Sequence, residues 1–363
     1  MQRDMHYYGT YAMARAAGLT VETARVIATA AQYVDDNANE KTVRMGDGAR
    51  IDVMATAHHT FDTDNIDEKD QRHVWVPFHF LPGNKGASYT ERLMCRKDGE
   101  MAREMVTHAL AKAGEPYAVE LMGVTAHVYA DTFSHYGFSG ISSRRNRVDN
   151  TTIELHGLGD EIETYIRKKA DEFFIEHGKY GGMLENFRAF ALDAVEKLSG
   201  ALGHGSVATY PDRPYLEWSF KYEDGGALSK RDNRTTFLEG CAALHDMFSR
   251  FAAARPDLKD AAGRKFSTIE GAVKDVLAVQ ADCDGRIEAW REAVKKGRVI
   301  AGKGEYIPGY DEKDWHKQCK VLAKWDDSGK ALSVPVFRFY QAAAVHRTYV
   351  LRELMPAHGL VID

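Results

Sequence analysis

The stretch of residues 116–137, PYAVELMGVTAHVYADTFSHYG, decides the fold. It is a long, mostly apolar run that opens with Pro116, a residue favoured in the first turn of a helix. His127, Asp131 and His135 stand at positions i, i+4 and i+8, so successive members are offset by about 40° around a helix and all leave from one face. Two imidazoles that flank a carboxylate form half of a shell for a divalent metal ion. The stretch therefore predicts a buried helix that carries part of a metal site.

Most of the remaining chain also has the apolar spacing of helices. We expect helices over residues 8–17 and 21–33, separated at Gly18, with Thr20 as the N-cap of the second. Strand signals are few, and Pro77 limits residues 73–81 to an edge strand or an extended segment. Further helices are predicted over residues 101–113, 160–176, 184–198, 236–254, 269–296 and 336–354, and loops at 62–70, 137–150, 200–214 and 221–233. The sequence thus predicts an all-α protein with little or no sheet.

The chain has 363 residues, of which 44% are hydrophobic and 28% are charged, as in globular proteins with an ordinary core. It has no internal repeat and no low-complexity linker, so the predicted loop at 221–233 is the one plausible boundary. We predict a metal-binding helical core over residues 1–230 and a C-terminal helical region, residues 231–363, packed on it.

Charge and terminal sequence narrow the class of protein. The net charge is −5 with interspersed signs, which gives no basic stripe for tracking phosphates, so no stable nucleic-acid partner is predicted. The N-terminus lacks a secretory signal, and no apolar run reaches the roughly 18 residues of a membrane span. The four cysteines lack CxxC spacing, which argues against a disulfide framework and a thiolate zinc site. We expect a cytoplasmic protein, with signal-independent export as the alternative.

The other half of the metal shell must come from residues outside the central stretch. Histidines in apolar surroundings are candidates because a buried imidazole costs stability unless something satisfies it. Carboxylates at the end of a predicted helix are candidates too, although each of these residues also has an ordinary interpretation as core packing or a solvated helix end. Adjacent histidines cannot share a helix face, so one ring of a doublet would ligate. The candidates are His6, Asp35, Asp36, His58, His59, His79, His204, Asp212 and Glu217.

Mixed ligation by His and Asp without thiolate suits zinc, with manganese and iron as competitors. A centre with two or three ions needs about seven to nine ligand atoms, and the candidates are sufficient in number. We therefore expect two or three zinc ions, or manganese or iron in their place.

The order of these residues resembles the zinc-dependent bacterial phospholipases C and the related fungal single-strand nucleases, which are all-helical and hold three zinc ions in a cleft. The shared pattern begins with an N-terminal His, an Asp at a helix end and an isolated His that is often followed by Phe. It continues with HxxxD on a long helix, a His soon after it, and a later His with a carboxylate. This chain matches it with His6, Asp36 or Asp35, His79 followed by Phe80, His127, Asp131, His135, and His204 with Asp212 or Glu217. Over roughly residues 1–220, segments such as WVPFHFLPGN and AHVYADTFSHYGFSG more closely resemble a bacterial family of unknown function.

The resemblance implies a multi-helix bundle with a metal cleft that hydrolyses a phosphoester, with phosphodiesters favoured, in a small molecule, lipid or nucleotide. Asp131 would bridge two ions, one bound also by Asp36, His79 and His127, the other by His135, His204 and a carboxylate. An unligated carboxylate, Asp35 or Asp62, would orient the attacking water. Arg144, with Arg145 and Arg147, would hold a second phosphate, unless the three form a solvated basic loop.

Two features depart from the family pattern. The phospholipases bind one ion through the amine and carbonyl of an N-terminal Trp, whereas this chain begins with Met1, so either His6 and Asp4 substitute or the third metal is missing. The usual carboxylate four residues after the late His is absent, because Ala208 follows His204 at that spacing. One ring of the His58–His59 doublet could complete the site.

Two other functions fit parts of the sequence. The doublet His245–Asp246 would suit an HD-type nucleotide phosphohydrolase. Alternatively, a single structural metal held by the central helix would pin a helical scaffold without enzymatic activity. No HExxH, GxSxG, Walker or Rossmann motif is present.

Overall fold

Helix α7 (Ala118–Ser134) lies in the middle of the molecule, and every one of its residues except Val119 is buried. It begins two residues after Pro116, because residues 115–118 form a turn closed by the Ala118 N–H bond to the Glu115 carbonyl (3.0 Å). It ends before Gly137, whose φ of +85° is a conformation that favours glycine. The predicted buried helix is therefore confirmed. The computed structural model that gives this fold describes residues 1–38, 42–51, 53–58, 68–184, 203–322, 324 and 328–362.

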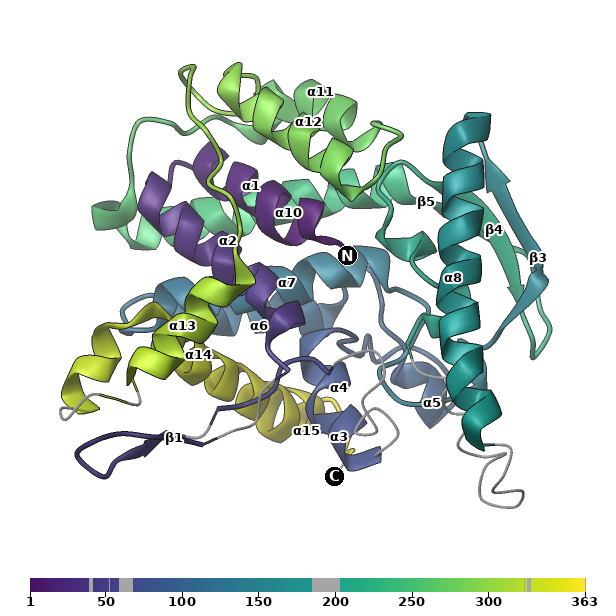
Figure 1. Ribbon diagram of the computed structural model, residues 1–363, viewed down its shortest axis with the longest axis horizontal. Coiled ribbons are helices and arrows are strands. Elements are labelled where there is room, and N and C mark those ends of the chain that lie inside the picture. The colour runs from purple at the N-terminus through teal and green to yellow at the C-terminus, as the bar shows by residue number, and fades with distance from the viewer. Residues whose placement is uncertain are drawn as a thin grey trace.

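Four long helices surround α7 and pack against it (Figure 1). They are α2 (Val21–Asp36), α6 (Glu100–Ala111), α10 (Asn233–Ala254) and α14 (Pro335–Tyr349). A π-helical turn, η1 (Asp4–Gly9), leads into α1 (Thr10–Ala16), which lies between α2 and α10. As predicted, the chain breaks at Gly18, and the Thr20 side chain caps α2 by accepting from the Thr23 N–H.

The C-terminal region adds helices on two sides of this group. Residues 269–296, predicted as one helix, form two: α11 (Phe266–Leu277) and α12 (Cys283–Lys295). The break arises because the Asp282 side chain accepts from the Gly285 N–H and caps the second helix. Beyond them lie α13 (Glu312–Leu322), η8 (Val350–Leu354) and α15 (Met355–Ala357), with short turns at η6 (Pro256–Leu258) and η7 (Ser328–Ser333).

The edge strand predicted at residues 73–81 is wrong, because the middle of this segment, residues 75–78, is helical. Two short helices, α3 (Glu68–His73) and α4 (Trp75–Phe78), cover this part of the chain. Pro77 is tolerated because it lies in the first turn of α4, where backbone N–H groups have no partner within the helix. Another one-turn helix, α5 (Tyr89–Arg92), follows.

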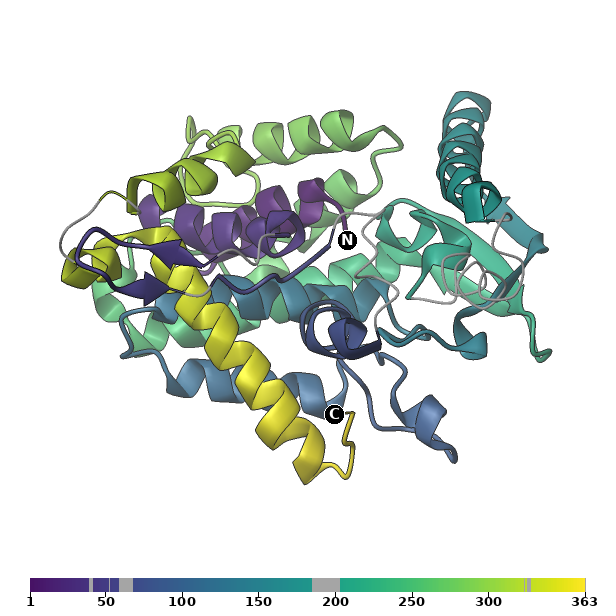
Figure 2. The ribbon, with the colours of Figure 1, turned by 60° about the horizontal axis from the view of Figure 1, so that its bottom comes forward.

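The prediction of a mostly helical protein is confirmed, and a small three-stranded antiparallel sheet is the main addition to it. Its strands are β3 (Val148–His156), β4 (Glu217–Tyr222) and β5 (Ser229–Asp232), in that order. The hairpin of β4 and β5 begins before the predicted loop at 221–233 and covers most of it. Figures 1 and 2 place this sheet beside helix α8 (Asp160–Leu184), at one side of the helical body. A two-stranded sheet joins β1 (Val43–Arg44) to β2 (Arg50–Ile51). The protein is thus mostly helical with two small sheets.

Two hydrophobic cores hold the fold together. The larger core runs from Met1 to Ile362 and contains residues from both sides of residue 230. The smaller core packs α8 and the three-stranded sheet around Phe138, Trp218 and Phe220. The short turns η4 (Gly205–Val207) and η5 (Tyr210–Asp212) contribute Val207 and Tyr210 to the smaller core, and a third turn, η3 (Arg144–Asn146), precedes β3. The predicted helix at 184–198 falls almost entirely outside the described residues.

Among the described residues, no helix is both long enough and apolar enough to cross a membrane.

Candidate metal centre

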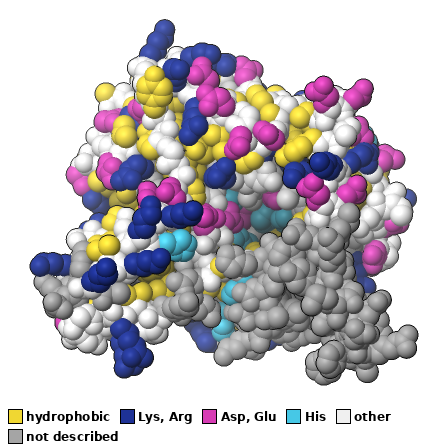
Figure 3. All heavy atoms as spheres, in the orientation of Figure 1, with side chains coloured by type: hydrophobic (Ala, Val, Ile, Leu, Met, Phe, Trp, Pro, Cys, Tyr) yellow, Lys and Arg dark blue, Asp and Glu magenta, His cyan; other side chains and the backbone are white. Residues whose placement is uncertain are grey.

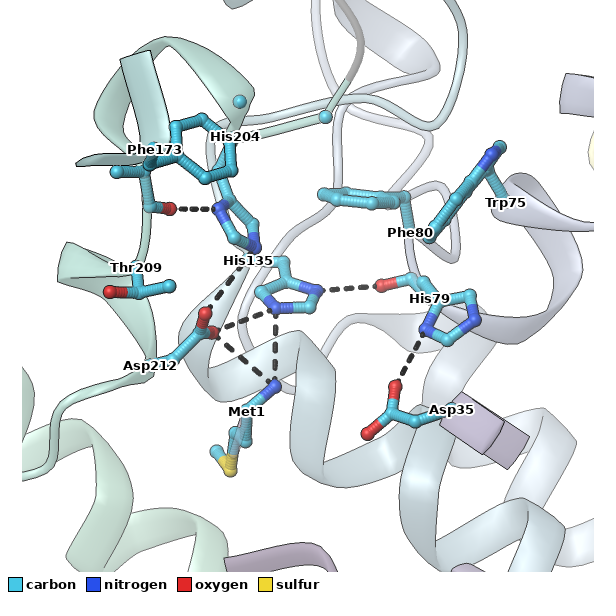
Figure 4. A pocket seen from close by; sticks show the side chains of 13 residues that line it. Met1, Asp35, Trp75, His79, Phe80, His135, Phe173, His204, Thr209 and Asp212 are labelled. Carbon is cyan, nitrogen blue, oxygen red and sulfur yellow. Dashed lines mark hydrogen bonds and ion pairs between the residues drawn. The ribbon is translucent and has the colours of Figure 1, made fainter. Parts of the chain in front are cut away.

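Histidine and aspartate side chains from five parts of the chain meet at the carboxyl end of α7. Figure 3 shows histidines gathered in a hollow near the middle of one face, beside acidic side chains. The hollow is a pocket of about 250 Å³. Figure 4 shows Asp212, His135 and His204 on one side of it and Asp35 and His79 on the other, with the rings of Trp75, Phe80 and Phe173 as apolar walls.

The first group of possible ligands contains Asp35, His79 and His127, with Asp131 beside them. His79 Nδ1 and His127 Nε2 are 3.2 Å apart. They lie 3.8 and 3.7 Å from Asp35 Oδ1, and 3.6 and 3.2 Å from Asp131 Oδ2. Ligand atoms around a tetrahedral zinc ion with bonds of about 2.1 Å are about 3.4 Å apart. The separations of 3.2–3.8 Å are close to this value, so Asp35, His79 and His127 could hold one zinc ion.

The second group contains His135, His204 and Asp212. His135 Nε2 lies 3.3 Å from Asp212 Oδ1, and His204 Nε2 lies 3.8 Å from Asp212 Oδ2. Asp212 ends the turn η5, and Ser134 on α7 donates a hydrogen bond to its Oδ1 (3.2 Å). Of the two predicted partners of His204, Asp212 is the one that lies beside it, because Glu217 pairs with Arg234 instead.

The third group contains His6, His127 and Asp131. The rings of His6 and His127 stack with centroids 3.8 Å apart, and His6 Nε2 lies 3.1 Å from Asp131 Oδ1. Both ring nitrogens of His6 and Asp131 Oδ2 are buried without a hydrogen bond. The Met1 ammonium, 2.7 Å from Asp131 Oδ1 and 3.4 Å from Asp212 Oδ1, is a cation that joins the second and third groups.

Each of four histidines in these groups uses one ring nitrogen to hold a backbone carbonyl. A carbonyl accepts hydrogen bonds, so the nitrogen next to it carries the proton and the other nitrogen has a free lone pair. Histidine ligands in metalloproteins are oriented in this way. The pairs are His79 Nε2 with Thr56 O (2.8 Å), His127 Nδ1 with Ala31 O (2.8 Å), His135 Nδ1 with His79 O (3.0 Å) and His204 Nδ1 with Ala208 O (2.8 Å).

The electrostatics of the site favour charged aspartates. Burial alone would raise the pKa of Asp131, but His135, the Met1 amine and His127 together hold it well below its ordinary value. Burial is likewise outweighed at Asp212, whose pKa is lowered by the Met1 amine and His204. Both carboxylates are therefore ionised near neutral pH, as metal ligands must be.

Most of the histidines are held neutral. Burial lowers the pKa values of His6 and His204 to about 4, and it also lowers the pKa of His79. His127 differs, because Asp131 and Asp35 outweigh its burial and raise its pKa. Neutral imidazoles are the form that binds metal ions.

Asp36 belongs to none of the three groups, whereas its neighbour Asp35 belongs to the first. Successive residues at the end of α2 point about 100° apart, and the rotation of the helix directs Asp35 towards His79 and His127. The Asp36 carboxylate instead accepts a hydrogen bond from Tyr310, and burial raises its pKa to about 6. Gln32 lies within 3.5 Å of both carboxylates and joins them.

Other predicted site residues lie elsewhere. Arg144 is exposed in η3 and does not line the pocket, whereas its neighbour Arg145 pairs with Glu91 (3.3 Å), so the solvated loop is the better description. His58 is buried but belongs to none of the three groups. His59 and Asp62 fall outside the described residues.

The HD doublet does not form a site. The His245 ring lies 2.8 Å from the Arg264 carbonyl and is buried, while Asp246 is exposed near Arg250. Neighbouring residues of a helix point in different directions, so the pair is divided between the core and the surface.

Sequence reasoning missed several residues that support the site. The carbonyls of Ala31, Thr56 and Ala208 leave no trace in the sequence, because every residue has one. Ser134 and Gln32 had a usable signal, since each lies one turn or less from a predicted ligand on the same helix.

One protein-family model matches the chain, over residues 1–354, and it describes a family of unknown function, DUF6765. Comparisons with curated proteins and with solved structures found no match. Since the match spans nearly the whole sequence, including every candidate ligand described above, the chain belongs to the DUF6765 family of unknown function.

Proposed function

We propose that this protein is a metal-dependent hydrolase of phosphoesters with a centre of two or three metal ions. The observation that carries the proposal is the position of the Asp131 carboxylate. Its Oδ1 faces His6 and the Met1 amine, at 3.1 and 2.7 Å, and its Oδ2 faces His127 and His79, at 3.2 and 3.6 Å. Asp131 therefore lies between possible metal ligands on two sides, so its carboxylate could contact more than one bound ion.

A metal ion also explains the buried atoms that have no hydrogen bond. Burying an unsatisfied polar group costs about 1–3 kcal/mol of stability. The two His6 nitrogens and Asp131 Oδ2 would therefore destabilise the fold if these residues served only in packing. The ring orientations of four histidines also support a bound metal ion, because each leaves one nitrogen lone pair free: His79, His127, His135 and His204. Nitrogen and oxygen donors without thiolate suit zinc, with manganese or iron as competitors.

The residues around the centre would divide the work of hydrolysis. Bound ions would activate a water for attack on phosphorus and offset the charge that grows on the phosphoryl oxygens. Asp35, His79 and His127 would hold one ion, and His135, His204 and Asp212 the other. The Asp35 side chain is 31% exposed, far more than the Asp131 side chain at 1%, so it stands where substrate and water enter. The apolar walls would exclude other water from the reacting groups.

The pocket favours a small substrate or a small part of a larger one. A volume of about 250 Å³ suits a phosphoryl group with one substituent, which includes lipid headgroups, nucleotides and small diesters. Neither a stable nucleic-acid partner nor a particular cellular location is required by this site.

Hydrolysis of chromogenic phosphoesters tests the proposal. We expect the metal-loaded protein to hydrolyse bis(p-nitrophenyl) phosphate, to lose this activity after chelation and to recover it when zinc or manganese is restored. His127→Ala should lower kcat/KM by about a hundredfold or more, because it removes a ligand of two groups. The matched control is His156→Ala, an exposed histidine on β3 that should retain full activity. Activity that survives both chelation and His127→Ala would contradict the proposal, and one metal ion without any activity would favour the scaffold alternative.

A further inference from the structure

A buried arginine that has no counter-ion among the described residues lies beside the metal pocket. Arg213 follows Asp212 directly and is only 3% exposed. Of its donors, Nη2 makes a hydrogen bond to Thr209 Oγ1 (3.1 Å), whereas Nε and Nη1 have no partner. No carboxylate of the described residues forms an ion pair with it. A buried cation of this kind costs several kcal/mol unless it is paired, so it requires an explanation.

The groups around Arg213 are also donors or neutral rings. The guanidinium lies over the Tyr165 ring of α8, 5.4 Å from its centroid. The hydroxyl of Tyr215 is buried without a hydrogen-bond partner, and burial raises the pKa of this phenol while Arg213 and Arg286 oppose the rise. The side-chain oxygens next to Arg213 are the hydroxyls of Thr209 and Tyr215, which are both neutral. The cluster of Arg213, Thr209 and Tyr215 offers several donors and no anion.

The carboxylates of Glu172 and Asp4 form ion pairs with cations other than Arg213. Glu172 on α8 pairs with Lys169 (2.8 Å), and Asp4 pairs with Arg286 (2.7 Å). Lys169 adds a further positive charge to the region, since it and Arg213 repel each other. Within the described residues, Arg213 thus has no carboxylate partner, whereas its neighbours Lys169 and Arg286 each have one.

We propose that Arg213, with Thr209 and Tyr215, binds an oxyanion of the phosphate class at the edge of the metal pocket. A planar guanidinium donates in pairs to the oxygens of a phosphate or carboxylate, and a buried, charge-assisted hydrogen bond is stronger than a neutral one. Thr209 lines the pocket and touches Arg213, which places the oxyanion next to the space that a substrate would occupy. This site uses no metal ligand and does not depend on the proposed hydrolysis.

Binding of inorganic phosphate, measured by isothermal titration at constant ionic strength, tests the site. We expect Arg213→Met to weaken binding by about tenfold or more, because it removes the charge and all donors but keeps a side chain of similar length. Arg167→Met is the matched control: Arg167 is a half-exposed arginine of α8 that pairs with Glu163, and its loss should leave phosphate binding unchanged. Asp131→Ala separates this site from the metal centre, since a variant that loses metal should still bind phosphate at Arg213.

The outcomes are distinct. Equal phosphate affinity in wild type and Arg213→Met would overturn the proposal, as would binding lost in Asp131→Ala but retained in Arg213→Met. If Arg213→Met fails to fold, Tyr215→Phe provides the second test, because it removes only a hydroxyl that has no partner. Weaker phosphate binding in Tyr215→Phe would support the oxyanion site, and unchanged binding there would overturn it.

Discussion

Helix α7 carries two buried carboxylates whose surroundings differ. Asp131 lies among histidines and the Met1 ammonium, so its pKa falls well below its ordinary value. Glu120 lies about three helical turns before Asp131 on the same helix. It is 2% exposed, and its Oε2 has no hydrogen-bond partner among the described residues. Burial raises its pKa to about 7, and Arg338 opposes the rise only weakly. The same helix therefore holds Asp131 charged, while Glu120 keeps a proton at pH values where an ordinary glutamate has lost it.

Glu120 makes stability depend on pH. Between pH 4.5, its ordinary pKa, and about 7 the folded protein keeps a proton that the unfolded chain releases, so the free energy of unfolding falls as pH rises through this window. The Glu120→Gln variant has no ionisable group at this position, so its free energy of unfolding should not fall through this window for that reason. We expect the variant to be more stable than wild type by about 2–4 kcal/mol at pH 8 and nearly equal to it at pH 4.5. Urea unfolding at both pH values measures this, and an equal difference at the two would show that Glu120 does not titrate in the window.

Single residues also show what sequence can predict about a site. Spacing alone placed His127 and Asp131 on one face, because the period of a helix is fixed. Spacing failed to choose between Asp35 and Asp36, since that choice depends on how α2 rotates against α7. It also failed at Arg144, because nothing local distinguishes a solvated arginine from one that binds phosphate.

At the scale of elements, the close contact of α2 and α7 assembles the first metal group. α2 supplies Asp35 and the Ala31 carbonyl, and α7 supplies His127. Gly123 permits the contact, because a Cβ there would lie 2.5 Å from both the Ile27 carbonyl oxygen and the Ala30 Cβ. The separation of the two helices therefore sets the distance between ligands.

Gly123→Ala should disturb both packing and metal binding. The added methyl group must push α2 away from α7, which we expect to lower the free energy of unfolding by about 1–3 kcal/mol and to reduce the metal bound per chain. Gly271→Ala on α11 is the matched control: no atom lies within 4 Å of its added methyl, so it should stabilise the protein by about 0.5–1 kcal/mol through helix propensity. Denaturant unfolding measures the stability of both variants, and elemental analysis measures their metal content. A Gly123→Ala variant with wild-type stability would contradict the role of this contact.

Elements with a regular apolar period were predictable, and those that depend on distant partners were not. The helices α1, α2, α6, α7 and α10 follow their sequence patterns. The strands β4 and β5 pair across a short turn, with Trp218 opposite Arg231. Their pattern is too polar and too brief to be recognised without the β3 strand that lies about 60 residues earlier.

At the scale of the whole molecule, the C-terminal region completes the structure around the site. The segment between α12 and α13 reaches back to the first helices, where Glu305 pairs with Arg15 (2.6 Å) and Tyr310 donates to Asp36. His346 on α14 lies 2.8 Å from the Pro77 carbonyl, two residues before His79. Helices α10 and α14 also cover two faces of α7.

The predicted N-terminal core should therefore not fold by itself. A shortened chain of residues 1–230 would expose the faces of α7 that α10 and α14 bury, and we expect it to lack a cooperative unfolding transition. Circular dichroism during thermal unfolding tests this, with the full chain as the control. A sharp transition in residues 1–230, together with bound metal, would show that the division at residue 230 separates two independent units.

Metal content per chain, measured by elemental mass spectrometry, tests the central claim most directly. We predict two or three equivalents of zinc, manganese or iron in the wild-type protein, a clear loss in His127→Ala and no loss in His156→Ala, which changes an exposed histidine outside the site. One equivalent that persists in His127→Ala, or no metal in protein never exposed to a chelator, would contradict the proposed centre.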